Sequence, residues 1–197
     1  MPRRRDVDAQ RRTLSTAVWA VLAREGLPGL TLRAVAVEAG CTTGLVLHTF
    51  TDKRALLRHA RDLLHERTGV RADAAAGGAQ NPTTALRDVL RQALSLTDGK
   101  REEARVWVGF LAAALPDEDL RAVHVAHNRS FVERVADLVG ACRPDLAPAA
   151  RRNAAVTLVA QVEGLNALAA ADPETYTPHR QRTALDRVLA TLLPPAG

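Results

Sequence analysis

The excess positive charge of this 197-residue chain, which could bind an anion, is concentrated near its N-terminus. The first 66 residues contain eleven Lys and Arg against seven Asp and Glu, which gives this segment a net charge of +4. The remainder carries only +1 of the total formal charge of +5, and the pI of the chain is about 10.2. This placement of charge favours an anionic partner bound by the N-terminal third.

Catalytic and metal-binding constellations are weak in this sequence. His124 and His127 lie three residues apart and could join Glu163 around a metal, but no third ligand follows at a fixed spacing. Neutral histidines hydrogen-bonded in a core or lining a pocket are the favoured interpretation. Cys41 and Cys142 are far apart and fit neither a zinc spacing nor a disulfide framework, so we expect free thiols. No nucleophile–base pair and no glycine-rich phosphate loop is recognisable, so we predict neither an enzyme nor a cofactor.

A second group of side chains could line a small-molecule pocket in the C-terminal part of the chain. Its members are Trp107, Phe110, His127, Asn128, Phe131 and Glu163. Apolar rings with a few polar groups are typical of such sites. If Glu163 and Trp107 converge, charge pairing and a cation–π contact would suit a quaternary ammonium compound. The alternative is that these residues are plain core, and that Glu163 is hydrogen-bonded inside the chain or at a subunit interface.

The elements that must position these groups are predicted to be helices throughout. The composition is 47% hydrophobic but only 3% aromatic, so Ala, Leu and Val supply most of the apolar mass. Their spacing follows a helical period and no alternating strand pattern is present. The expected fold is all-α, with a three-helix N-terminal domain followed by a C-terminal helical bundle.

Three short helices are predicted at residues 12–25, 32–39 and 43–48, with Thr31 capping the second and Thr51 capping a fourth. A tight turn at residues 40–42 makes the second and third a helix-turn-helix. Val46 and Phe50 would anchor the third helix, so that its outer side can enter a major groove of DNA. The residues left for DNA are Thr42, Thr43, Leu45 and His48, with Gly44 allowing close approach of the backbone.

The stretch "TLRAVAVEAGCTTGLVLHTFTDKRALL" resembles the N-terminal domain of TetR-family transcriptional regulators over roughly residues 10–60. The matching positions are Gly26, Thr31, Ala36, Gly40, Gly44, Phe50, Lys53 and Leu57. More loosely, "WVGFLAAALPDEDLRAVH" and "PETYTPHRQRTALDRVLATLL" are similar to the C-terminal domain of the BetI-like branch. The resemblance implies a repressor that binds a near-palindromic operator as a homodimer and is released by a small molecule.

Further DNA contacts are expected around this motif. Thr51, Lys53 and the free N–H groups that open the fourth helix would hold a phosphate. Thr31 and Arg33 could add phosphate or base-edge contacts. The residues 3–5, all Arg, would form a flexible arm along the backbone or in the minor groove, unless they are a terminus without a role. Leu47 stands where the family usually carries a Tyr that contacts a phosphate, so this contact is not carried over.

The expected domains are residues 1–51 for DNA binding and 52–197 for effector binding and dimerisation, with a helix at 52–68 connecting them and a loop at 69–84. The last two helices would pair with those of a second copy, because residues 149–171 are apolar almost all round.

No apolar run is expected to reach the ~20 residues of a membrane span, and no secretion signal is visible, so a cytoplasmic protein without a membrane partner is predicted. Two rival functions remain: a helical interaction module with a vestigial DNA-binding domain, which Leu47 would suit, and an enzyme in the C-terminal domain.

Overall fold

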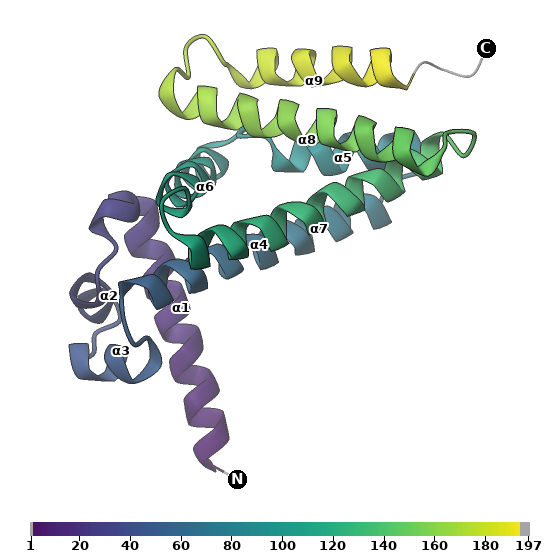
Figure 1. The fold of residues 1–197 in the computed structure, drawn as a ribbon. Coiled ribbons are helices and arrows are strands. Elements are labelled where there is room, and N and C mark those ends of the chain that lie inside the picture. The colour runs from purple at the N-terminus through teal and green to yellow at the C-terminus, as the bar shows by residue number, and fades with distance from the viewer. Residues whose placement is uncertain (1, 194–197) are drawn as a thin grey trace. The chain divides into compact units, whose positions relative to one another are not determined.

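The computed structural model describes residues 2–193, with side chains from residue 9 onward, and within that range it contains nine helices and no strand (Figure 1). The predicted all-α class is therefore confirmed. The chain divides into two compact units, unit 1 with Met1–His65 and Arg105–His124, and unit 2 with Glu66–Ala104 and Val125–Gly197. This division differs from the expected break at residue 51, because the helix that follows residue 51 packs its first turns into the core of unit 1.

Unit 1 begins with α1 (Pro2–Gly29), α2 (Leu32–Glu38) and α3 (Thr43–Thr49) (Figure 1). Helix α1 starts well before the predicted residue 12, and its regular geometry is interrupted at Gly26, where φ is 66°. The predicted end of the first helix near Gly26 thus corresponds to this kink. The arm proposed for the three N-terminal arginines concerns side chains that lie outside the described residues, although their backbone belongs to α1.

The turn between α2 and α3 depends on the backbone of Gly40. Its φ of 64° lies in the left-handed region that glycine adopts without steric strain. Gly40 N–H donates to the carbonyl of Val37 at 3.2 Å, and Cys41 N–H donates to the carbonyl of Ala36 at 2.9 Å. These two bonds form a Schellman motif, which ends α2 and redirects the chain into α3.

The core of unit 1 combines the first helices with parts of three later ones. The buried stripe of α1, including Leu14 and Val18, packs with side chains from α2 and α3 as the sequence predicted. Leu56 and Ala60 from the start of α4 (Lys53–Gly77) join it. The same cluster includes Phe110 from α6 (Asp98–Ala114) and Leu120 from α7 (Glu118–Cys142), which explains why segments far apart in sequence form one unit.

Helix α4 corrects two predictions. Its N-terminal cap is Asp52, whose Oδ1 accepts the N–H of Ala55 at 2.7 Å, and not Thr51. Its C-terminal end is Gly77, so the first half of the predicted loop at 69–84 is helical. The alanine-rich run has high helix propensity, which offsets the ~1 kcal/mol penalty of Gly69. Ion pairs of Arg71 with Glu103 and of Asp73 with Arg134 hold this extension in unit 2.

Unit 2 is a bundle of α5 (Pro82–Ala93), α8 (Pro148–Ala171), α9 (Pro178–Leu192) and the parts of α4, α6 and α7 that belong to this unit (Figure 1). Its core contains Leu86, Leu90, Leu158 and Leu185. Asn166 Nδ2 of α8 donates to the carbonyl of Ala93 at 2.7 Å, so this amide of an otherwise apolar helix has a partner within the chain.

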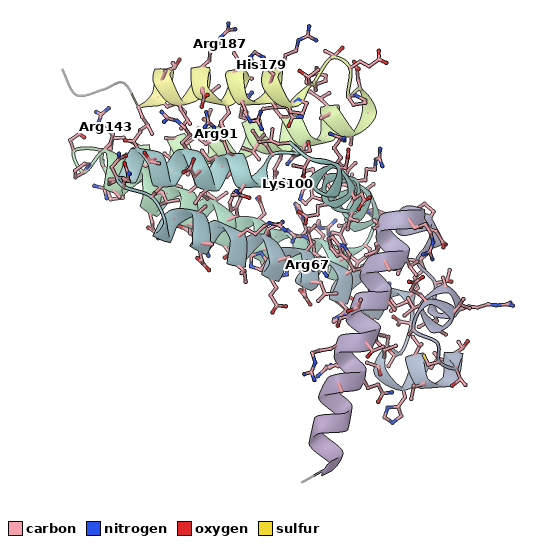
Figure 2. All side chains as sticks on the ribbon, turned by 180° about the vertical axis from the view of Figure 1, so that it is seen from behind. Arg67, Arg91, Lys100, Arg143, His179 and Arg187 are labelled. Carbon is pink, nitrogen blue, oxygen red and sulfur yellow. The ribbon has the colours of Figure 1, made fainter. Side chains whose placement is uncertain are left out.

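Polar groups also join α5 and α6 in unit 2. Lys100 Nζ donates to Gln92 Oε1 at 2.9 Å and to the Gln92 carbonyl, so the cation lies at the C-terminal end of α5 (Figure 2). Burial lowers the pKa of Lys100 to about 8, and repulsion from Arg71 acts in the same direction while Glu103 opposes it. The ammonium thus satisfies a helix-terminal carbonyl but is only partly solvated.

Helix α8 also corrects an expectation, because by length and composition it could cross a membrane. It is 24 residues long, and its most apolar window of 18 residues has a mean hydropathy of 1.4. Yet seven of its side chains, among them Leu158 and Val162, are buried in the core of unit 2. Core helices of globular proteins have the same composition, so the length and hydropathy of α8 are only weak support for a membrane span. Cys41 and Cys142 are both free thiols, as predicted.

Candidate nucleic-acid and effector sites

Helix α3 is fixed along one side and exposed along the other. Val46 is fully buried and Phe50, which caps the C-terminal end, is almost so. At the N-terminal end, Thr42 Oγ1 accepts the N–H of Leu45 at 3.3 Å. The exposed residues are Thr43, Gly44, Leu45, Leu47 and His48. A helix of seven residues is therefore held in place by its neighbours while most of its side chains face outward.

A contact that the sequence analysis missed supports the end of α3. The ring of Phe50 lies 4.9 Å from the ring of His59 in α4, measured between centroids. His59 Nε2 is in turn 2.8 Å from Ser15 Oγ in α1. These residues connect α1, α3 and α4 within unit 1. Ser15 and His59 are 44 residues apart, and no spacing rule could have paired them.

Two threonines predicted to contact DNA act as helix caps. Thr31 Oγ1 accepts the N–H of Ala34 at 3.0 Å, and Thr42 caps α3 in the same way. A hydroxyl that accepts a backbone N–H retains its own proton, which it can donate to a phosphate oxygen. Capping and phosphate binding are thus compatible for both residues. Arg33 is exposed and lies one residue inside α2.

The start of α4 differs from the predicted phosphate clamp. Lys53 is the first residue of α4 and both Thr51 and Lys53 are exposed, as a phosphate contact requires. The carboxylate of Asp52, however, already accepts one of the helix N–H groups. A carboxylate at this end competes with a phosphate for the same amides and repels it. The cation of Lys53 is therefore the stronger candidate for holding the DNA backbone.

The predicted effector residues belong to two units, which we describe separately. In unit 1, Phe110 is a core residue with 1% of its surface exposed, while Trp107 is half-buried with its ring 6.4 Å from that of His124. In unit 2, the side chains of His127, Asn128, Phe131 and Glu163 are all half-buried. Within the described part of the chain, Asn128 Oδ1 is buried without a hydrogen-bond partner. An unpaired buried acceptor is costly unless a ligand or water donates to it.

A surface hollow of about 250 Å³ lies in unit 1 between α1 and α2. Its lining residues are Thr13, Thr16, Ala17, Glu38 and Ala39. Both threonine hydroxyls donate to carbonyls of their own helix, and Glu38 Oε2 accepts from Arg24 at 2.9 Å. None of the predicted effector residues lines this hollow. Among the side chains from residue 9 to 193, no three His, Cys, Asp or Glu gather as a metal site would require.

Comparison with known sequences identifies both halves of the chain. Residues 15–60 match the family model described as bacterial regulatory proteins, tetR family, and residues 82–194 match that of the BetI-type transcriptional repressor, C-terminal. The transcriptional regulator BetI of Paraburkholderia xenovorans is 32% identical over 200 residues, covering 97% of this chain and 99% of that protein. BetI of Burkholderia thailandensis is 30% identical and covers 84% of both chains. These relatives are transcriptional regulators and not enzymes.

Comparison with solved structures gives the same fold. A transcriptional regulator from Rhodococcus sp. Rha1 has a TM-score of 0.82 at 26% identity, over 92% of this chain and 95% of that one. A putative transcriptional regulator from Saccharomonospora viridis, solved in complex with choline, has a TM-score of 0.81 at 19% identity, over 93% and 96%. The sequence matches and the exposed third helix agree, and the chain belongs to the TetR family of transcriptional regulators, with a C-terminal domain of the BetI type.

Proposed function

We propose that this regulator acts in the cytoplasm as a homodimeric repressor, which binds a near-palindromic operator through α3 and is released by a small molecule. The observation that carries the proposal is the outward face of α3. Val46 and Phe50 occupy the buried side of this helix, while Thr43 and His48 are exposed and can hydrogen-bond to base edges. The net charge of the N-terminal segment is positive, which suits a duplex.

Contacts to the phosphates are assigned to exposed residues that flank α3. Thr31 and Arg33 lie at the start of α2, and Thr51 and Lys53 at the start of α4. Such contacts position a protein on DNA without reading its sequence. Thr42, Gly44 and Leu45 complete the proposed interface on α3 itself.

Salt-dependent binding tests this function and separates it from a vestigial domain. We expect the full chain to bind random duplex DNA at low salt, and the promoter beside its own gene more tightly. Each lost phosphate contact makes the slope of log K against log salt less negative by about 0.9, so Lys53→Gln should make it less negative by about 1.8 in a dimer. The control Arg129→Gln alters an exposed arginine of unit 2 and should leave the slope unchanged. Fluorescence anisotropy with labelled duplexes measures the affinities and their dependence on salt. If neither duplex binds, the interaction-module alternative is favoured.

The proposed dimer interface lies on α8 and α9, and its apolar part lies on α8. Val156 and Leu168 of α8 are 52% and 47% exposed, and Ala160 lies on the same side of the helix. The outer side of α9 is basic instead, and it carries His179 and Arg187 (Figure 2). An apolar stripe on a helix that is otherwise buried in its own unit is typical of an isologous interface with a second copy.

Charge introduced on this stripe should separate the subunits. Val156→Arg and Leu168→Arg would each bury an unpaired guanidinium at the interface, which is strongly unfavourable. Light scattering after size exclusion should then give the mass of one 21.2 kDa chain. The control Val70→Arg alters a valine that is 64% exposed on α4, and it should remain dimeric. A dimeric Leu168→Arg variant would place the interface elsewhere.

The effector is proposed to be a small organic cation that also carries a hydroxyl. A regulator of the same fold was solved in complex with choline, which has both groups. In unit 2, Glu163 offers a negative charge and Phe131 an aromatic ring, while Asn128 Oδ1 can accept from a hydroxyl. His127, which is next to Asn128 in the sequence and half-buried, completes the proposed effector residues in unit 2. Trp107 and Phe110 belong to unit 1 and are not needed for this proposal.

Titration with choline tests the effector class. Calorimetry should detect choline binding to the full chain, and the uncharged isostere with carbon in place of the ammonium nitrogen should bind roughly tenfold more weakly. Glu163→Gln should reduce this difference. Saturating choline should lower the affinity for operator DNA by about 5- to 150-fold, the usual range of coupling between two sites. Equal binding of both compounds would contradict a cation-specific site.

A further inference from the structure

Exposed apolar side chains are concentrated next to the proposed DNA-binding surface. Seven large hydrophobic residues are exposed in the described part of the chain, and three of them lie in α2 and α3: Val37, Leu45 and Leu47. Leu45 and Leu47 are 40% and 45% exposed. A single exposed leucine needs no explanation, but a leucine on a face that meets DNA must contact something there.

The helical period places Leu45 toward the outward side of α3. Val46 and Phe50, four residues apart, mark the buried side. Gly44 and His48, also four apart, lie on the opposite side, and Leu45 precedes His48 by three residues. Residues separated by three or four positions share a helix face. Leu45 therefore shares the outward side with His48. Leu47 lies three residues after Gly44 and three before Phe50, so it stands between the outward and the buried side.

The backbone beside Leu45 is also open. A Cβ atom added to Gly44 would meet only Thr42 Oγ1, at 3.9 Å, so the fold itself has room for a side chain at this position. Gly44 has no positive φ either, since the only such glycines in the described chain are Gly26 and Gly40. Its bare backbone allows α3 to approach a partner closely, and this brings the neighbouring side chain of Leu45 into contact range.

The chemistry of the major groove then limits what Leu45 can contact. An isobutyl group forms no hydrogen bonds, and it would desolvate any base-edge donor or acceptor that it covered. The C5-methyl of thymine is the apolar group that base pairs present in this groove. We propose that Leu45 packs on a thymine methyl in each operator half-site and so specifies T·A at that position. This inference rests on the proposed DNA-binding function.

The experiment removes the methyl group alone. The full chain is first used to select binding sites from a pool of random-sequence duplexes. Each thymine position of the selected site is then tested in a separate duplex, in which deoxyuridine replaces that thymine and its symmetry-related copy in the other half-site. Burial of one methyl group corresponds to about fourfold in affinity, so removal of the contacted methyl group from both half-sites should weaken binding about fifteenfold. Leu45→Ala should bind the thymine and uracil forms of this site equally well.

Leu47→Ala is the matched control, because it removes the same atoms from an equally exposed residue of the same helix. It should retain the preference for thymine over uracil. Both substitutions are on the surface, so circular dichroism should show unchanged thermal unfolding. The inference is overturned if no thymine depends on its methyl, or if the dependence persists in Leu45→Ala. A pool without any enriched site would overturn the DNA-binding function and this inference with it, whereas an enriched site that is indifferent to methyl removal overturns the inference alone.

Discussion

Replacement of both Thr43 and His48 by alanine is expected to abolish the preference for the operator while leaving binding to random duplex DNA nearly unchanged. The two side chains are exposed on α3 and, in the proposed function, supply its hydrogen-bonding groups for base edges. Each good base contact is worth about 1–3 kcal/mol of discrimination, so two residues in two half-sites, at the lower value of about 1 kcal/mol each, should account for roughly a thousandfold in affinity. Because neither side chain is buried, the stability of unit 1 should change by less than about 0.5 kcal/mol.

Binding to the operator and to random duplex DNA, measured at one salt concentration, checks this expectation. Lys53→Gln is the informative comparison, since the loss of a phosphate contact should weaken both DNAs by a similar factor. The double variant should thus weaken binding to the operator alone, whereas Lys53→Gln should weaken binding to both DNAs. Equal losses on both DNAs for the Thr43 and His48 variant would mean that α3 is not the recognition helix.

Phe50→Ala is expected to lower the free energy of unfolding of the protein by about 3–5 kcal/mol, the usual range for a buried phenylalanine. The ring is buried in the core of unit 1, and its contact with His59 connects the end of α3 to α4. Removal of the ring leaves a cavity at the point where α3 is anchored. DNA binding should be lost together with stability, because a helix of seven residues does not persist without tertiary support.

Urea denaturation followed by circular dichroism measures this effect. Leu47→Ala is the control, since it truncates an exposed side chain of the same helix and should cost much less. If both variants were equally stable, the anchoring role of Phe50 would be wrong. Val46, which is also buried, would then have to hold α3 alone.

The sequence predicted unit 1 well because its signals are local. A stripe of apolar residues marked the buried side of α1, Thr31 marked the start of α2, and Gly40 marked the turn. Each signal acts over three or four residues, so it can be read without tertiary structure. The exposure of His48 followed from the same periodicity, whereas Thr43, three residues before the buried Val46, is exposed at the first position of α3.

Several predictions that failed depended on contacts distant in sequence, whereas the cap of α4 by Asp52 in place of Thr51 is a local error. The extension of α4 to Gly77 is supported by ion pairs of Arg71 and Asp73 with Glu103 and Arg134, which are about 30 and 60 residues further along the chain. The contact of Ser15 with His59 is of the same kind. Membership of an effector site also requires convergence of several helices, so the assignment of residues such as Asn128 to it is still a proposal.

The carboxylate of Asp52 at the start of α4 has a kinetic consequence for a regulator that must find its operator. If Lys53 holds a phosphate as proposed, the negative charge next to it should shorten the time that the protein spends on unrelated DNA, because sequence-independent affinity is electrostatic. Shorter pauses on genomic DNA allow each molecule to sample more sites per second. Under the proposed function, the residue that caps α4 would thus also influence how fast the repressor redistributes along the chromosome.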